Sequence, residues 1–279
     1  MVRRLASALV ALIAMSTAGC GGQPAAPSVA VGATPDAESA LVAHLYAAAL
    51  RSYGSPAHVQ TEDDPLTELD AGNVVIVPGF TGRLLARFEP DAPARAAAQV
   101  YRTMVSALPE GVAAGDYTTS AEDKPALAVT EATPDAWGGR DVTAAVRHCD
   151  KMKVGWAPDV PRPETIGTCK AQTRGYPDSA TLFAALRTGE INAAWTSTAA
   201  PNIPTELLML SDRTSLIRAE NLVPLYRRNE LTESQVLAIN EVAGVLDTAA
   251  LAQMRAEVAD GTEPGLVANG FLAEHPLGD

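Results

Sequence analysis

The sequence is poor in basic and aromatic residues. Its 279 residues include 21 Lys and Arg against 33 Asp and Glu, a formal net charge of −12. Binding to nucleic-acid phosphates or to anionic lipid needs clustered Lys and Arg, so we expect neither a nucleic-acid partner nor electrostatic attraction to a membrane. The chain has only four Phe, three Trp and six Tyr, which makes any aromatic residue at a candidate site informative. With 47% hydrophobic and 19% charged residues, the chain is too apolar to be disordered, and we expect a globular protein.

Signatures of common enzymes are missing as well. The sequence contains no G-x-S-x-G, no H-E-x-x-H, no phosphate-binding loop and no G-x-G-x-x-G after a predicted strand. Its histidines are scattered without metal-ligand spacing, at His44, His58, His148 and His275. We therefore expect a protein that is not an enzyme and that holds no metal and no cofactor. A hydrolase with a pair of carboxylates far apart in the sequence stays an alternative.

The N-terminal segment contains an apolar run that is too short to span a membrane. The run covers residues 5–15, whereas a membrane span needs about 20 apolar residues. Arg3 and Arg4 precede the run, and the small residues 16–19 follow it. This order is typical of a secretory signal peptide, which we expect to comprise residues 1–19.

Cys20 directly follows these small residues, as in the lipobox of bacterial lipoproteins. By that similarity Cys20 would become the lipidated N-terminus, bearing diacylglycerol and palmitate. The protein would then be anchored to the cell membrane on its extracytoplasmic side. Residues 20–30 are rich in Gly, Pro and other small residues, a composition that suits a flexible tether. Thr17 departs from the usual lipobox leucine, so an ordinary cleaved signal with an incidental cysteine is the alternative.

The two remaining cysteines, Cys149 and Cys169, are expected to form a disulfide. Export places them outside the reducing cytosol, where disulfides persist. Closing a loop of about 20 residues stabilises a protein by about 3 kcal/mol. The alternatives are two buried free thiols, a metal site, or a Cys–His dyad with the adjacent His148. Neighbouring residues usually point apart, and no second ligand pair has zinc spacing, so we prefer the disulfide.

Hydrophobic periodicity predicts strands that alternate with helices. Asp36 is expected to cap a first helix, and Thr232 with Gln235 forms a capping-box signature for a late helix. Asp247 or Thr248 is expected to cap the helix that follows. Further helices are expected over residues 92–108 and 181–187, and strands over residues 73–77, 126–129, 153–156, 191–195 and 207–210 and near Leu216. This alternation is typical of an α/β fold with parallel sheets and right-handed crossovers.

Six segments stand in an order that carries a family resemblance. They are Gly32 with Glu38, Phe80-Thr81-Gly82-Arg83, residues 122–129, residues 186–195, residues 221–224 and residues 267–272. In this order the chain resembles the substrate-binding proteins of glycine betaine, choline and proline betaine ABC importers, the OpuAC or ProX-like family. The resemblance covers residues 31–278, and it depends on order and spacing, because no single segment is specific.

The resemblance implies an α/β protein with two lobes and a hinge between them, the type II periplasmic-binding-protein fold. Lobe one would comprise residues 31–116 plus 216–279, and lobe two residues 117–215, which hold both cysteines of the predicted disulfide. Such lobes close on a ligand like a hinged clamp. The implied function is that of a monomeric solute-binding protein, which captures a small polar solute, osmoprotectant-like or diverged, and delivers it to an ABC permease. A non-transport lipoprotein with the same fold, acting as a scaffold or regulatory binding module, is the alternative.

In this family a cage of aromatic side chains holds the ligand's quaternary ammonium by cation–π attraction, worth about 2 kcal/mol or more when desolvated. The resemblance assigns two walls of the cage to Phe80 and Trp195. The other two walls are replaced by Pro125 and Glu220, and Arg83 replaces a threonine. These substitutions favour a ligand other than betaine. Five polar residues are also expected to line the cleft, namely Thr34, Ser39, Asp123, Lys124 and Thr196.

Two ligand chemistries fit these residues. A cation with N–H donors could lie between Phe80 and Trp195, with Glu220 supplying the negative charge. Alternatively, Arg83 could clamp the carboxylate or phosphate of an anionic or zwitterionic solute. The two aromatic residues could equally belong to the core, with Arg83 paired to a surface acid. In a further alternative the cleft has lost ligand binding.

Overall fold

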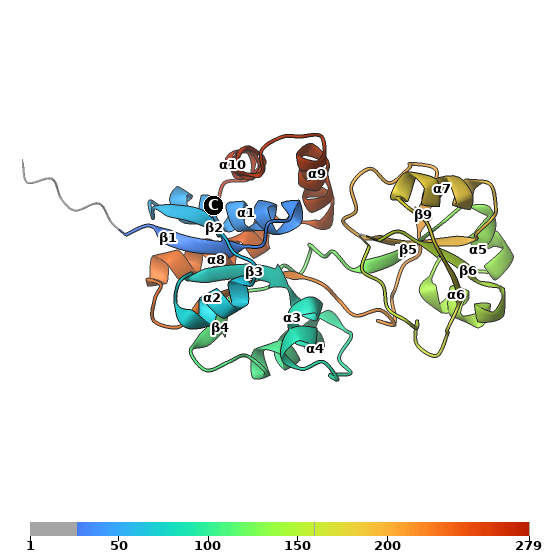
Figure 1. The fold of residues 1–279 in the computed structure, drawn as a ribbon, viewed down its shortest axis with the longest axis horizontal. Coiled ribbons are helices and arrows are strands. Elements are labelled where there is room, and N and C mark those ends of the chain that lie inside the picture. Colours follow the sequence, from blue (N-terminus) through green and yellow to red (C-terminus); the bar gives the residue numbers. More distant parts are fainter. Residues whose placement is uncertain (1–26, 159, 279) are drawn as a thin grey trace, which may run out of the picture.

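The computed structural model describes residues 27–158 and 160–278, which form two α/β lobes side by side (Figure 1). Within these residues each lobe contains one five-stranded sheet. The predicted signal peptide, Cys20 and most of the predicted tether lie outside the described residues. The first strand begins at Val29, so the tether expected over residues 20–30 can extend no further than Ser28.

The sheet of lobe one has the strand order β2-β1-β3-β10-β4. Its strands are β1 (Val29–Ala33), β2 (Ala57–Thr61), β3 (Ile76–Phe80), β4 (Val112–Ala114) and β10 (Leu222–Arg227). β1 is parallel to β2 and β3, whereas β10 is antiparallel to β3 and β4. The sheet is therefore mixed, not parallel as predicted, because β10 re-enters lobe one from lobe two without an intervening helix.

Strand β3 continues through the two residues that were predicted to end it. The predicted strand covered residues 73–77, with Pro78 and Gly79 as the stop, but β3 includes both and ends at Phe80. Pro78 lies opposite Pro224 of β10, so the two residues without an N–H share one register position. Alternate pairs of an antiparallel ladder exchange no hydrogen bonds, and two facing prolines fit such a pair. The shift brings Phe80 to the carboxyl end of the strand.

The helices of lobe one are α1 (Ala37–Ser52), α2 (Pro65–Ala71), α3 (Thr81–Phe88), α4 (Ala97–Ser106), α8 (Glu233–Val245), α9 (Thr248–Ala259) and α10 (Pro264–Glu274). Three predicted caps are confirmed. Asp36 caps α1, and Asp247 caps α9. Thr232 forms the reciprocal capping box with Gln235 at the start of α8. Helix α4 is shorter than the helix predicted over residues 92–108.

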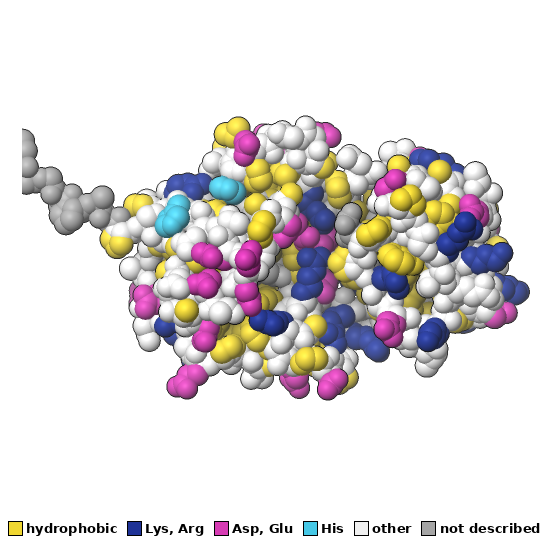
Figure 2. Space-filling view, viewed as in Figure 1, with side chains coloured by type: hydrophobic (Ala, Val, Ile, Leu, Met, Phe, Trp, Pro, Cys, Tyr) yellow, Lys and Arg dark blue, Asp and Glu magenta, His cyan; other side chains and the backbone are white. Residues whose placement is uncertain are grey.

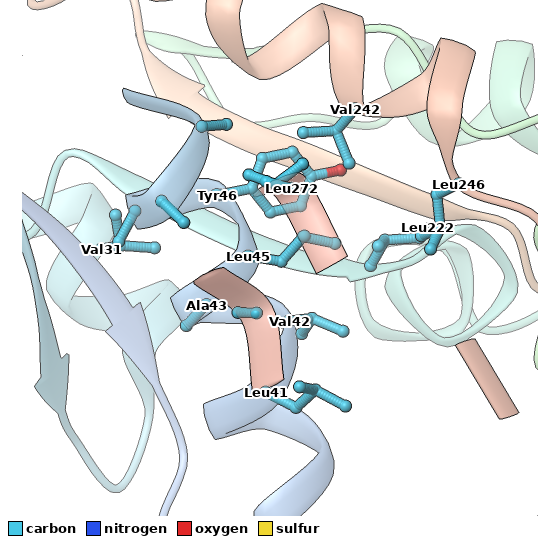
Figure 3. Close-up of a cluster of buried hydrophobic side chains, with 14 of the residues drawn as sticks. Val31, Leu41, Val42, Ala43, Leu45, Tyr46, Leu222, Val242, Leu246 and Leu272 are labelled. Atoms are coloured by element: carbon cyan, nitrogen blue, oxygen red, sulfur yellow. The ribbon is translucent and has the colours of Figure 1, made fainter. Parts of the chain in front are cut away.

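The core of lobe one is built around α1, which is buried along most of its length. Leu41, Leu45 and Tyr46 are among the largest fully buried side chains of the described residues. Figure 3 shows them in one cluster with side chains from α8 and α10, including Val242 and Leu272. The C-terminal helices therefore pack on α1 and hold its position in the lobe.

In the described part of the chain, no single helix is both long and apolar enough to cross a membrane. Helices α8 and α9 meet that criterion only when taken together, and the pair is bent by 98°. Ala238, Ile239 and Val242 of α8 are buried in lobe one.

The sheet of lobe two has the strand order β7-β6-β8-β5-β9 and is also mixed. Its strands are β5 (Pro125–Val129), β6 (Lys153–Trp156), β7 (Gln172–Gly175), β8 (Ala193–Ser197) and β9 (Leu208–Met209). Its helices are α5 (Ala132–Trp137), α6 (Val142–Arg147), the 3₁₀ helix η1 (Cys149–Lys151) and α7 (Ser179–Arg187). Four of the predicted strands correspond to β5, β6, β8 and β9, and the helix predicted over residues 181–187 corresponds to α7.

The strand predicted near Leu216 does not form. The Asp212 carboxylate accepts hydrogen bonds from the backbone N–H groups of Leu216 and Ile217, each at 2.9 Å. These bonds hold the segment in a turn, because the N–H groups that a strand would direct to a neighbouring strand are directed to one side chain instead.

The predicted disulfide between Cys149 and Cys169 is confirmed. Their Cα atoms are 5.6 Å apart, within the separation of about 4.4–6.8 Å that is usual for disulfides. Cys149 begins η1, and Cys169 lies in the loop before β7. The bond therefore lies entirely within lobe two and does not restrict movement of one lobe relative to the other.

The chain crosses between the lobes twice, after β4 and before β10 (Figure 1). We call these two crossing segments, residues 118–124 and 217–221, the hinge. They are hydrogen-bonded to each other: the Asp123 N–H donates to the Glu220 carbonyl at 2.8 Å. The side-chain amide of Asn221, a buried residue, donates to two backbone carbonyls of the first segment. The two crossing segments of the hinge are thus hydrogen-bonded to each other and do not connect the lobes independently.

Candidate binding site between the lobes

A cavity of about 590 Å³ lies between the lobes, and we call it the interlobe groove. Lobe one contributes Glu38 from the first turn of α1 and Arg255 from α9, while the hinge contributes Asp123. Lobe two contributes Thr196 and Ser197 from the end of β8. The remaining lining residues also come from lobe two and are Val160, Pro161, Ser179, Ala180, Phe183, Arg187, Ala200, Pro201, Asn202 and Pro204. Figure 2 shows basic and acidic side chains gathered where the two lobes meet.

Four charged side chains on the lobe-one side of this groove form a closed set of contacts, which we call the ion-pair ring (Glu38, Arg83, Asp123 and Arg255). Arg83 donates from Nη1 to Glu38 Oε1 at 2.9 Å and from Nη2 to Asp123 Oδ2 at 2.6 Å. Arg255 donates from Nη1 to Asp123 Oδ1 at 2.7 Å, and its Nη2 lies 3.8 Å from Glu38 Oε2. Carboxylates and guanidinium groups alternate around the ring, so their charges balance.

The ring is tightest at Asp123 and loosest between Glu38 and Arg255. The Asp123 side chain is 1% exposed, and each of its oxygens accepts a short bond from one arginine. The side chains of Glu38 and Arg255 are 23% and 20% exposed, and their 3.8 Å contact is the longest in the ring. Burial raises the pKa of Glu38, and the charge of Arg83 partly offsets that effect. Glu38 and Arg255 therefore keep hydrogen-bonding capacity toward the groove, whereas Asp123 is occupied.

Phe80 lies beneath Arg83 and is not open to the groove. The guanidinium carbon of Arg83 is 4.6 Å from the centroid of the Phe80 ring, a cation–π contact within the chain. Phe80 is 4% exposed, so the aromatic face that the resemblance assigned to a ligand is covered by Arg83. Arg83 in turn is held by Glu38 and Asp123 and is not a free clamp for an anion. Phe80 and Arg83 line a second cavity of about 290 Å³ on lobe one.

Glu220 caps helix α3 from the hinge. Its carboxylate accepts a hydrogen bond from the backbone N–H of Arg83 at 2.9 Å. Burial raises the pKa of Glu220 to about 7, although the charge of Arg83 and the backbone bonds oppose the shift. A Cβ at Gly82 would lie 2.6 Å from Oε1 of Glu220 and 2.5 Å from a hinge carbonyl, so glycine is required for this close approach. Glu220 thus joins the hinge to lobe one and is not a wall of the groove.

Thr196 lines the groove, and its neighbour Trp195 does not. Trp195 is 2% exposed and belongs to a core cluster of lobe two with Trp137 and Met152. Because successive side chains of a strand point to opposite faces of the sheet, Trp195 and Thr196 of β8 face different sides. The larger apolar side chain is buried in the core. The structure therefore corrects the assignment of Trp195 as a cage wall.

Three other expected lining residues lie elsewhere. Thr34 and Ser39 line the second cavity of lobe one, where the Thr34 N–H donates to Ser39 Oγ at 2.9 Å. Lys124 lines a separate cavity of about 340 Å³, and its Nζ lies 3.6 Å from Glu122 and 3.8 Å from Asp212. The Thr34–Ser39 bond stabilises the N-terminus of α1, and the contacts of Lys124 stabilise the hinge. Of the residues expected to bind ligand, the groove brings together Asp123 and Thr196.

The groove also contains residues that the sequence did not mark as ligand-binding. From the sequence, Glu38 was named only as part of a family segment, with no role in ligand binding. Its position in the first turn of a helix was the one local feature that could have indicated such a role. Arg255 offered no signal, because nothing along the chain relates it to Asp123. Phe183 is the aromatic side chain among the described residues that line the groove, and it is 7% exposed. No group of three or more His, Cys, Asp or Glu side chains within residues 27–158 and 160–278 could hold a metal ion.

No protein-family model matches the chain, and no curated protein matches it. Solved structures do. Apo YehZ from Escherichia coli has a TM-score of 0.70 at 19% identity, over 90% of this chain and 99% of that one. A glycine betaine/carnitine/choline ABC transporter structure has a TM-score of 0.73 at 17% identity, over 89% and 98% of the two chains. The glycine betaine/L-proline-binding protein ProX from Borrelia burgdorferi has a TM-score of 0.55 at 10% identity, over 89% and 93%.

These similarities define the class of fold. The chain has the two-lobed α/β fold of ABC-transporter substrate-binding proteins, as the sequence resemblance predicted. The particular structures that it resembles are those of glycine betaine, carnitine, choline and proline transport systems. At identities below 20% the similarity establishes the fold, and the ligand has to be inferred from the groove itself.

Proposed function

We propose that this protein is the solute-binding protein of an ABC importer and that it captures a small polar solute in the interlobe groove. The main support is the cavity of about 590 Å³, whose lining includes polar and charged side chains from both lobes and the hinge. A ligand in this position contacts both lobes at once and so favours the closed arrangement over the open one. Capture then needs closure and contacts but no covalent chemistry.

The proposal includes an anchored position on the extracytoplasmic side of the cell membrane. Its supports are the signal-like N-terminal segment with its lipobox-like Cys20 and the disulfide, which suits an oxidising compartment. A lipid on Cys20 would hold the monomeric binding protein near the ABC permease to which it delivers its solute.

Thermal-shift screening of the full-length protein tests the proposed capture. The panel comprises betaines, choline, amino acids, polyamines and sugars. A ligand at 100 times its dissociation constant stabilises the folded protein by about 2.7 kcal/mol, which is a readily measured shift in Tm. We expect at least one compound to raise Tm and to reduce the radius of gyration in solution scattering, because the lobes close on it. A panel in which no compound does either contradicts the proposal.

Membrane fractionation tests the anchor separately. The wild-type protein is expected in the membrane fraction, and Cys20→Ser is expected to leave it, because the serine cannot accept the lipid through a thioether. Gly21→Ala keeps the cysteine and should stay with the membrane. If Cys20→Ser and the wild type distribute alike, the lipid anchor is excluded while solute capture remains open to the first experiment.

A further inference from the structure

Glu38 and Arg255 present opposite charges side by side on the lobe-one wall of the groove. Both line the cavity, both are about one-fifth exposed, and their mutual contact is 3.8 Å. Each can therefore bind a ligand without losing a short ion pair. A ligand with a single charge would meet a like charge on the neighbouring residue, whereas a ligand with both charges matches this wall.

Arg83 removes the other means of holding a cation on lobe one. Its guanidinium covers the Phe80 ring at 4.6 Å and binds Asp123, whose side chain is 1% exposed. A quaternary ammonium has no N–H donor and depends on open aromatic faces. Among the described residues of the groove it would find one aromatic side chain, Phe183, which is 7% exposed. A cationic group in this groove must therefore be held by hydrogen bonds to Glu38.

The facing wall of lobe two adds neutral polar groups and one charged residue, Arg187, whose Nε donates to Glu206 Oε1 at 2.7 Å. Thr196 and Ser197 line the groove at the end of β8 and are 2% and 6% exposed. The Thr196 hydroxyl can donate to or accept from either end of a polar ligand. The cavity of about 590 Å³ lies within the range usual for small-molecule sites, about 300–1,000 Å³.

We propose that the groove selects a small zwitterion whose ammonium group carries N–H donors, the chemistry of an α-amino acid, over a quaternary ammonium. Glu38 accepts hydrogen bonds from the ammonium group, and Arg255 binds the carboxylate. Arg83 determines specificity by covering Phe80. This inference depends on the proposed function, because it names the class of solute that the importer would take.

An N-methylation series tests the inference. Isothermal titration of the full-length protein first identifies the tightest ligand among the twenty amino acids, glycine betaine, choline and glucose. The amine of the tightest amino acid is then methylated one, two and three times. Each methyl group removes a donor to Glu38, so we expect the affinity to fall at each step and by about tenfold or more over the series.

Two substitutions assign the roles of the charged residues. Glu38→Gln and Arg255→Gln are each expected to weaken binding of the unmethylated zwitterion by about tenfold or more. The matched controls are Glu131→Gln and Arg140→Gln. Glu131 and Arg140 form an exposed ion pair on lobe two, and their side chains are 67% and 63% exposed. Substitution of either residue should leave the affinity unchanged. If Arg255→Gln does not fold, Arg255→Lys keeps the charge and should still weaken binding, because it lacks the two-pronged guanidinium.

The outcomes separate this inference from the function on which it depends. An affinity that rises with methylation, or a panel in which betaine, choline or glucose binds more tightly than every amino acid, overturns the inference and leaves solute capture intact. Unchanged affinity in both Glu38→Gln and Arg255→Gln also overturns it. A panel in which nothing binds contradicts solute capture itself, and the inference with it.

Discussion

The guanidinium of Arg83 lies over the ring of Phe80, 4.6 Å from its centroid. In the family that the sequence resembles, this ring position belongs to a wall of the aromatic cage that receives the ligand's cation. Here the chain supplies the cation itself, and Glu38 and Asp123 hold it in place. We infer that this contact both stabilises lobe one and disfavours a quaternary ammonium as the solute.

Removal of Arg83 should destabilise the protein more than removal of an exposed arginine. Arg83→Ala leaves the buried Asp123 with one partner in place of two, so we expect the free energy of unfolding to fall by about 2 kcal/mol. Arg87→Ala is the control, because Arg87 is 58% exposed and pairs with the exposed Asp64. That substitution should cost less than about 1 kcal/mol. Urea denaturation measures both, and equal losses would contradict the role of the ion-pair ring.

Glu220 should make stability depend on pH. Burial raises its pKa in the folded protein from the ordinary 4.5 to about 7. Between these values the folded protein binds a proton that the unfolded chain releases, so the contribution of Glu220 to stability is largest at low pH and falls as pH rises toward 7. The full effect of this carboxyl group is about 3 kcal/mol.

Glu220→Gln isolates this contribution. The variant should lose the fall in stability between pH 4.5 and pH 7 that the wild type shows, and at pH 8 it should be the more stable of the two. Denaturation with urea at several pH values measures the difference between the two proteins. Parallel pH curves for wild type and variant would show that Glu220 does not titrate in this range.

Gly82 is required for the approach of the hinge to α3. In Gly82→Ala the new Cβ would lie 2.5 Å from the Ala219 carbonyl oxygen and 2.6 Å from Oε1 of Glu220. Displacement of the hinge should cost about 1–3 kcal/mol and weaken solute binding. Gly244→Ala in α8 meets nothing within 4 Å and should stabilise by up to about 1 kcal/mol. Thermal unfolding and titration on both variants check the contrast, and a neutral Gly82→Ala would argue against a tight hinge.

Neighbouring residues of β8 should have different effects on stability and on binding. Trp195→Phe leaves a void in the core of lobe two, so it should lower Tm while changing affinity little. Thr196→Val keeps the side-chain shape and removes the hydroxyl from the groove, so it should weaken solute binding about two- to tenfold. Measurement of Tm and affinity on both proteins tests the assignment. Loss of affinity in Trp195→Phe with none in Thr196→Val would reverse it.

The disulfide should stabilise lobe two without taking part in binding. The double variant Cys149→Ala, Cys169→Ala opens a loop of about 20 residues and should lower the free energy of unfolding by about 3 kcal/mol. Treatment of the wild type with a reductant should give the same loss. Solute affinity at a temperature where both proteins are folded is expected to be equal, and an altered affinity would mean that the bond constrains the groove.

Local rules predicted the parts of the fold that depend on neighbouring residues. The caps at Asp36, Thr232 and Asp247 follow from hydrogen bonds within one helical turn, and they are where the sequence placed them. Strand direction depends on how the chain returns from the other lobe, and local patterns do not contain that information. The predicted parallel sheets are mixed for this reason, and β3 extends through Pro78 because Pro224 faces it.

The candidate site was harder to predict than the fold. Asp123 and Thr196 were expected in the cleft and do line it. Trp195 was expected there too, but it lies one position earlier on β8 and belongs to the core cluster of lobe two. A shift of one residue reverses the face of a strand, and the order and spacing of the segments do not specify which face a residue takes. Arg255 reaches Asp123 only through the packing of the C-terminal helices on α1, which no spacing along the chain reveals.

The order of the strands along the chain also sets the order in which the two sheets can be completed during synthesis. Lobe two is built from one continuous stretch, whereas the sheet of lobe one is completed by β10, which inserts between β3 and β4 after all strands of lobe two have been made. Arg255, on α9, follows later still. During synthesis, lobe two can thus fold first, and the charged wall of the interlobe groove is completed by nearly the last part of the polypeptide to be made.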